Sequence, residues 1–161
     1  LLGYPDQALA RSQAILAAAQ ASQHAVSLAR ALHDMMTLQK LQGEAHAALE
    51  WADAAVALMT ELGFGLHANP ITFTRGWALA AQGRHEEGMA QMRHSVAHLR
   101  TIGARFRLPH CLGLLAEAHG RQGECSIGLT LLDEALAMIQ QGEQHLYTAG
   151  LVAMFEASTS H

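Results

Sequence analysis

A period of forty residues runs through the chain, and it restricts the fold more than any other feature of the sequence. Glycine recurs at the same point of each period, at Gly3, Gly43, Gly83 and Gly123. When the four periods are aligned, three further positions are of one kind in every period. A small residue stands five positions after the glycine, and apolar residues stand six and thirteen positions after it. Their members are Ala8, Ala48, Gly88 and Gly128; Leu9, Leu49, Met89 and Leu129; and Leu16, Val56, Val96 and Leu136. Such a period is typical of repeat proteins, in which each unit packs on its neighbours.

Each unit contains two stretches with the periodicity of an α-helix. In the segments 85–102 and 107–121, for example, apolar side chains recur at spacings of three and four residues. The composition agrees, because 31 alanines and only 5% aromatic residues favour closely packed helices over a β-sheet. The predicted helices are residues 5–21, 24–40, 45–62, 69–82, 85–102, 107–121, 125–141 and 144–157.

We therefore expect an all-α fold. Two antiparallel helices per unit, stacked with a constant offset, would form a right-handed α-solenoid of about eight helices. We expect residues 1–161 to be a single repeat domain and a fragment of a longer chain, with units that begin near residues 1, 41, 81 and 121. Residues 158–161 carry no apolar period and are expected to fray.

Gly83 and Gly88 have the spacing of the two glycines in a phosphate-binding P-loop. That loop requires Lys and then Ser or Thr after the second glycine, because these side chains contact the phosphates and the magnesium ion. Met89 and Ala90 stand there instead. Because the two positions recur in every unit as a glycine and a small residue, we interpret Gly83 as a left-handed turn residue and Gly88 as a point of close helix packing.

The unit resembles the tetratricopeptide repeat, whose signature combines small residues in both helices with a turn glycine. The matching positions are Gly76 and Ala116 in the first helix, Gly43, Gly83 and Gly123 at the turn, and Ala48, Gly88, Gly128, Ala55 and Ala135 in the second helix. The departures are Leu79 or His119 for the usual aromatic residue, Met92 or Leu132 for the usual phenylalanine, and the missing terminal proline. The unit is also forty residues long rather than thirty-four.

Residues 75–143 are also similar to the C-terminal repeat region of large bacterial signalling proteins. The resemblance lies in "RGWALAAQGRHEEGMAQMRHSVAHLRTIGA" and "LPHCLGLLAEAHGRQGECSIGLTLLDEALAMI". In that family a class III adenylate or guanylate cyclase domain and a STAND-type ATPase module precede the repeats. The resemblance implies a cytoplasmic module that senses or docks a partner, with catalysis and ATP binding outside this chain. The residues themselves supply no catalytic motif, so we expect no enzyme activity and no cofactor.

In a stack of this kind the first helix of each hairpin lines the concave face. Each hairpin is folded about a turn glycine, so its first helix is the one before the glycine, at residues 24–40, 69–82 or 107–121. Its outward positions are therefore the candidate contacts with a protein or peptide, which could be another domain of the same chain. Phe73 and Trp77 are four residues apart and share one side of a helix, so we expect an exposed aromatic pair. The alternative is that Trp77 packs between units. The candidate partner-binding residues are Arg30, His33, Thr37, Lys40, Phe73, Trp77, His110, Glu117 and Arg121.

Other functions remain open beside partner binding. The repeats could hold a small molecule or metal inside the superhelix, act as a spacer, or form a homodimer through their exposed terminal half-units. His94 and His98 have the spacing of two metal ligands on one helix, but a zinc site needs a third and usually a fourth, so we interpret them as solvated surface. Cys111 and Cys125 would lie roughly 15 Å apart along a helix. A disulfide needs Cα atoms within about 7 Å, so we expect two thiols, one of them buried.

The charge distribution argues against nucleic acid and membrane as partners. The net charge is −4, and no apolar run approaches the length of a membrane-spanning helix. Residues 88–116 contain four arginines and no acid, whereas residues 117–143 contain five acids and one arginine. This asymmetry could be a docking surface or a head-to-tail match between molecules, and we interpret it as a solvated face.

Overall fold

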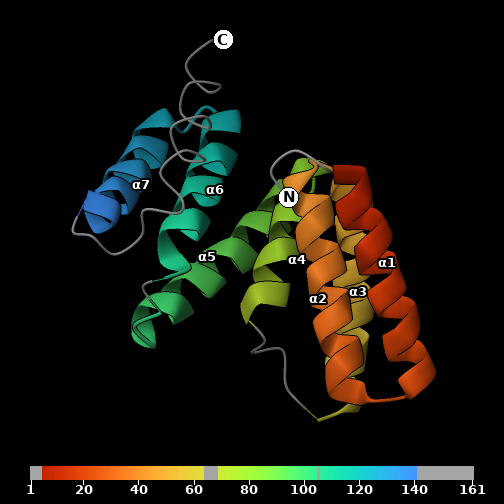
Figure 1. Cartoon of the computed structure of the whole chain (residues 1–161). Coiled ribbons are helices and arrows are strands. Elements are labelled where there is room, and N and C mark those ends of the chain that lie inside the picture. The colour runs from red at the N-terminus through yellow and green to blue at the C-terminus, as the bar shows by residue number, and fades with distance from the viewer. Residues whose placement is uncertain (1–4, 64–68, 105, 141–161) are drawn as a thin grey trace. The chain divides into compact units, whose positions relative to one another are not determined.

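The computed structural model describes residues 5–63, 69–104 and 106–140 of the 161. These residues form seven α-helices joined by turns, and no strand occurs among them (Figure 1). The all-α prediction is therefore confirmed for the described part of the chain. The helices are α1 (Pro5–Ser22), α2 (Ala25–Leu41), α3 (Ala45–Glu61), α4 (Asn69–Ala81), α5 (His85–Thr101), α6 (Leu108–Arg121) and α7 (Cys125–Met138).

The helix boundaries lie close to those that the sequence predicts. Six of the seven helices begin and end within one residue of the predicted limits, and α7 ends at Met138 rather than at residue 141. Pro109 stands in the first turn of α6, where its missing N–H removes no helical hydrogen bond. The predicted eighth helix at 144–157 and the tail at 158–161 lie outside the described residues.

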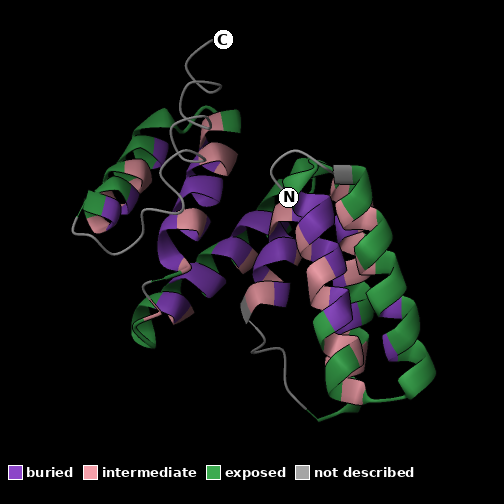
Figure 2. Cartoon of the chain, in the orientation of Figure 1, coloured by how far each residue is buried: buried purple, intermediate pink, exposed green. Residues whose placement is uncertain are grey.

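The chain divides into two compact units, Leu1–Gly88 and Met89–His161, with the boundary inside α5. In the first unit consecutive helices pack on one another from α1 to α4, and α2 also contacts α4. The core of this unit contains Leu32, Met35, Met36, Ala52 and Ala55, which come from α2 and α3. In the second unit α6 packs on α7. Figure 2 shows that exposed residues dominate α1 and α7, whereas buried residues dominate α6, in which residues 111–116 are all buried.

The turns between the helices confirm the predicted left-handed glycine at three members of the column, and the fourth, Gly3, lies outside the described residues. Gly43, Gly83 and Gly123 have φ values of +79°, +89° and +78°, in the left-handed region that a side chain disfavours. The residue after each glycine donates its N–H back to the preceding helix, as Glu44 does to the Gln39 carbonyl at 2.9 Å. Glycine at this point therefore ends one helix and satisfies its last carbonyls before the next helix begins. Gly63 and Gly103, which follow α3 and α5 at equivalent positions of two repeats, also have φ values in the left-handed region.

The small residue that follows five positions later lies where two helix backbones approach closely. A methyl group on Gly88 would lie 2.5 Å from both the Ala80 nitrogen and the Gly76 oxygen, which belong to α4. A methyl group on Gly128 would lie 3.0 Å from the Ala116 oxygen. Ala48, the member of this column in α3, is fully buried. The prediction of close helix packing is therefore confirmed at Gly88 and Gly128.

Among the residues that the structure describes, no helix is long and apolar enough to cross a membrane.

Candidate functional site

The predicted contact residues of α2 differ in how far the fold exposes them. Arg30 is exposed, and its Nε lies 3.6 Å from Asp34 Oδ1 on the next turn. His33 and Thr37 are half-buried. Lys40 is only 9% exposed. The first three remain accessible to a partner, whereas Lys40 is largely covered.

Phe73 is the clearest correction to the sequence prediction. Its side chain is 1% exposed, so it is a core residue and not one of an exposed aromatic pair. The reason is the contact between α2 and α4, which places Lys40 Nζ 5.9 Å from the centre of the Phe73 ring. A cation at this distance is attracted by the face of the ring, and the aliphatic stem of the lysine can cover apolar surface. Lys40 and Phe73 thus join α2 to α4.

Trp77 lies one turn after Phe73 and is half-buried. It stands forty residues after Thr37, so the two residues occupy the same register position in α2 and α4, which contact each other. His33 lies one turn before Thr37, on the same side of α2. We call His33, Thr37 and Trp77 the α2/α4 surface. It offers an imidazole, a hydroxyl and the accessible part of an indole on two packed helices.

The predicted contact residues of the second unit all lie on α6. His110 and Glu117 are half-buried, and Arg121 is exposed. The Arg121 guanidinium donates to Glu117 Oε1 at 2.5 Å, across one turn of the helix. Their charges therefore partly neutralise each other on the helix surface. A role of these three residues in binding stays a prediction.

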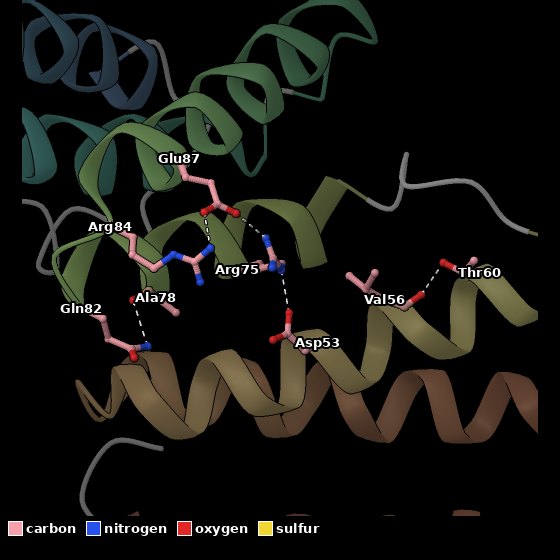
Figure 3. A network of polar contacts seen from close by, with 8 residues as sticks. All are labelled: Asp53, Val56, Thr60, Arg75, Ala78, Gln82, Arg84 and Glu87. Carbon is pink, nitrogen blue, oxygen red and sulfur yellow. Dashed lines mark hydrogen bonds and ion pairs between the residues drawn. The ribbon is translucent and has the colours of Figure 1, made fainter.

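A polar network in the first unit was not predicted from the sequence (Figure 3). Arg75 on α4 lies between two acids, with its Nε 2.7 Å from Asp53 Oδ1 on α3 and its Nη1 3.3 Å from Glu87 Oε1 on α5. Arg84 also pairs with Glu87. The network therefore connects three helices. Sequence carries little signal for it, because the partners of Arg75 are 22 residues before it and 12 residues after it.

The network shifts the pKa values of two of its members. Burial opposes the charge of Arg75, but its hydrogen bonds and charge interactions with Asp53 and then with Glu87 raise its pKa above the ordinary value. Desolvation raises the pKa of Glu87, but hydrogen bonds from Arg84 and Arg75 outweigh it and hold the pKa below its ordinary value. Both shifts favour the charged forms, so the network stabilises the fold at neutral pH.

We expect Arg75→Gln to lower the free energy of unfolding by about 1 kcal/mol at pH 7, the size of a partly exposed ion-pair network screened by water. Because the pKa of Glu87 is lowered by folding, its contribution is present above the unfolded pKa, near 4.3, and is lost as pH falls through the lower folded value. The difference between the variant and the wild type should therefore shrink below about pH 4. Urea denaturation followed at several pH values measures it. Arg93→Gln, at an exposed arginine of α5, is the matched control, and an equal loss there would contradict the role of the network.

An ion pair within the second unit joins the arginine-rich segment 88–116 to the acidic segment 117–143. Arg100 on α5 forms a two-pronged pair with Glu134 on α7, with Nε to Oε1 at 3.1 Å and Nη2 to Oε2 at 2.6 Å. The buried His119 lies with its Nδ1 2.5 Å from Glu124 Oε2, across the turn between α6 and α7. The arginine-rich and acidic segments thus meet within one molecule, which limits the charge left for a head-to-tail contact.

The candidate metal and thiol residues differ in how far the fold exposes them. Cys111 is buried and Cys125 is exposed, and neither forms a disulfide. His94 is exposed and His98 is half-buried. Within residues 5–63, 69–104 and 106–140, no group of three or more histidine, cysteine or acidic side chains could hold a metal ion.

Comparison with models of known protein families and with curated protein sequences gives no match for this chain.

Proposed function

We propose that this chain is a non-catalytic protein-interaction module, built as a right-handed α-solenoid of tetratricopeptide-like hairpins, that binds a peptide or partner domain on its α2/α4 surface. The observation that carries the proposal is the contact between α2 and α4, the first helices of two successive hairpins. In a stack of equivalent hairpins, such a contact brings side chains at the same register position of two repeats next to each other. A row of such helices forms the extended binding surface of a solenoid.

The chemistry of the surface suits a peptide. Aromatic side chains anchor many protein interfaces, because they present a large area and lose little conformational freedom on binding. Trp77 supplies such an anchor, with an N–H that can donate to a peptide carbonyl. Thr37 and His33 add a hydroxyl and an imidazole beside it. The exposed pair of Arg30 and Asp34 provides charges of both signs one turn further along α2.

The packing beneath the surface holds these side chains in place. Phe73, one turn before Trp77 on α4, is almost fully buried, and so are Met35 and Met36 of α2. Side chains on rigid helices bind with a smaller entropic cost than side chains on a loop. Such packing favours a preorganised α2/α4 surface, which would lower the entropic cost of binding a partner.

We propose that this module is part of a cytoplasmic, bacterial signalling protein whose cyclase or ATPase domains lie outside residues 1–161. This proposal comes from the resemblance of residues 75–143 to the repeat regions of such proteins. In that setting the partner would be a peptide segment or a neighbouring domain, and the repeats would regulate by docking it.

The test has two stages. Immobilised protein is used to capture partners, which are identified by mass spectrometry, and the purified partner is then titrated by calorimetry. We expect Trp77→Ala and Thr37→Arg each to weaken binding roughly 30-fold or more, the effect of a hot-spot residue. Trp51→Ala and Thr60→Arg are matched controls, because Trp51 is also a half-buried tryptophan and Thr60 is exposed at the end of α3.

The outcomes distinguish the proposal from its alternatives. If a folded Thr37→Arg protein binds as tightly as the wild type, or if the control variants lose binding equally, the α2/α4 surface is not the binding site. If no partner is captured and one metabolite or zinc raises the melting temperature instead, the module is a sensor. If neither occurs and ultracentrifugation shows a dimer, the repeats act as an assembly element.

A further inference from the structure

The corner at which α5 leads into α6 exposes two large apolar residues. Ile102 directly follows α5, and Phe106 stands two residues before the start of α6. Both are 57% exposed, more than any of the exposed apolar residues of α7. Figure 2 shows the end of α5 as exposed. Neither residue belongs to the buried core, so their apolar area is available to a partner.

Backbone hydrogen bonds attach this corner to the two helices. Ile102 donates its N–H to the His98 carbonyl at 3.0 Å, which continues the hydrogen bonding of α5 by one residue. The carbonyl of Arg107 accepts from the Cys111 N–H at 3.1 Å, which begins the hydrogen bonding of α6. Ile102 is thus fixed to the end of one helix, and Phe106 lies next to the start of the other.

The charges near the two apolar residues are all positive. Residues 88–116 contain no acid. The charge of Arg100 is paired with Glu134 of α7. Arg93 is exposed and Arg107 is half-buried, and neither takes part in an ion pair within the part of the chain that the structure describes. We call Arg93, Ile102, Phe106 and Arg107 the α5/α6 face.

We propose that the α5/α6 face binds an acidic segment of a partner protein, a segment that also carries a large apolar residue. The apolar residue would contact Ile102 and Phe106, because buried aromatic and aliphatic contacts supply most of the energy of an interface. Carboxylates of the segment would pair with Arg93 and Arg107, whose guanidinium groups match a carboxylate in shape and charge. This face lies in the second unit, so it is a docking site additional to the α2/α4 surface of the first unit.

The length of α5 sets the spacing of the acidic segment. Arg93 lies nine residues before Ile102, which is roughly 14 Å along a helix. An extended peptide of about four residues spans that distance. The segment should therefore carry an acid about four residues from its apolar anchor, and a second acid beside the anchor can reach Arg107.

The charge of the chain favours a different protein over other anionic partners. A second copy of the chain offers few free acids, because Glu117, Glu124 and Glu134 are already paired within the second unit. Anionic lipid surfaces are bound by clusters of about four or more Lys and Arg near one another. The net charge of −4 also opposes binding to lipid or nucleic acid. An acidic protein segment needs only the two unpaired arginines of the α5/α6 face.

Selection of a phage-displayed library of random peptides on the immobilised 161-residue chain tests the proposal. A parallel selection uses the Ile102→Ser, Phe106→Ser double variant, whose fold is checked by circular dichroism. Peptides enriched only on the wild type should carry acids and a large apolar residue at the predicted spacing. In titrations of one such peptide by fluorescence anisotropy, Phe106→Ser should weaken binding roughly tenfold and Arg93→Gln roughly threefold. Sodium chloride at about 0.5 M should weaken it as well.

Three further variants act as controls. Ile127→Ser changes an apolar residue of α7 that is 45% exposed, and Arg11→Gln changes an exposed arginine of α1. Both should bind the peptide as the wild type does. Trp77→Ala should also leave this binding unchanged, so a failure of the α2/α4 surface is distinguishable from a failure of the α5/α6 face.

Four results would overturn the proposal. One is that no peptide depends on Ile102 and Phe106, and another is that the dependent peptides carry no excess of acids. The third is binding of phosphatidylserine vesicles or single-stranded DNA, but of no acidic peptide, through the α5/α6 face. The last is a dimer, seen by light scattering, that Phe106→Ser dissociates, because a second copy would then cover the face.

Discussion

Gly88→Ala is expected to lower the free energy of unfolding by about 2 kcal/mol, the cost of overpacking less the gain in helix propensity. The added methyl group would lie 2.5 Å from two backbone atoms of α4 and 2.9 Å from the Ala80 side chain. Backbone atoms within a helix cannot move aside as a flexible side chain can, so α4 and α5 must separate locally. Urea denaturation, followed by the fluorescence of Trp51 and Trp77, measures the loss in the first unit.

Two other glycines provide a graded control for this prediction. At Gly128 the methyl group would lie 3.0 Å from the Ala116 oxygen, so Gly128→Ala should cost less than Gly88→Ala. At Gly120, which is also helical, it would meet nothing within 4 Å. Gly120→Ala should therefore stabilise the protein by roughly 0.5 kcal/mol, because alanine favours the helix. Equal changes in the free energy of unfolding at all three glycines would show that Gly88 and Gly128 are not required for close backbone packing.

Phe73→Ala is expected to lower the free energy of unfolding by about 3–5 kcal/mol, the usual effect of removing a buried phenylalanine. The substitution leaves a cavity between α2 and α4 and removes the ring beneath the Lys40 ammonium. Phe106 is 57% exposed, and Phe106→Ala should cost less than about 1 kcal/mol. Thermal and urea unfolding compare the two variants. A mild effect at Phe73 would mean that its side chain is accessible, as the sequence pattern alone predicts.

The repeating features of this fold could be predicted because they are local. Helical periodicity, a left-handed glycine and a small residue at a close contact each act over a few residues, and here each recurs every forty. The recurrence distinguishes a structural requirement from a chance match. At Gly83 and Gly88 it favours a turn and a close helix contact over a P-loop. It also identifies the turn glycines at 43, 83 and 123, all of which are left-handed in the structure.

The sequence predictions that the structure corrects concern side chains whose exposure depends on contacts between distant segments, namely Phe73 and Lys40. The helical pattern shows that Phe73 and Trp77 share a side of α4, but it does not show how far α2 covers that side. The pattern places Lys40 among the outward positions of its helix, yet it lies over the Phe73 ring and only 9% of it is exposed. The network of Arg75 requires side chains from three helices, and no period relates its members. Such residues are found from packing, not from sequence spacing.

If one hairpin geometry repeats every forty residues, the exposed residues Gln42, Gln82 and Gln122 should show it most directly. These three occupy the same register position, one residue before the turn glycine. Spin labels are attached at two of them at a time, in a protein whose two cysteines are replaced by alanine, and electron paramagnetic resonance measures the distance between the labels. A repeating stack predicts the same distance distribution for the 42–82 pair and the 82–122 pair. A clearly longer or broader distribution for the 82–122 pair would contradict it.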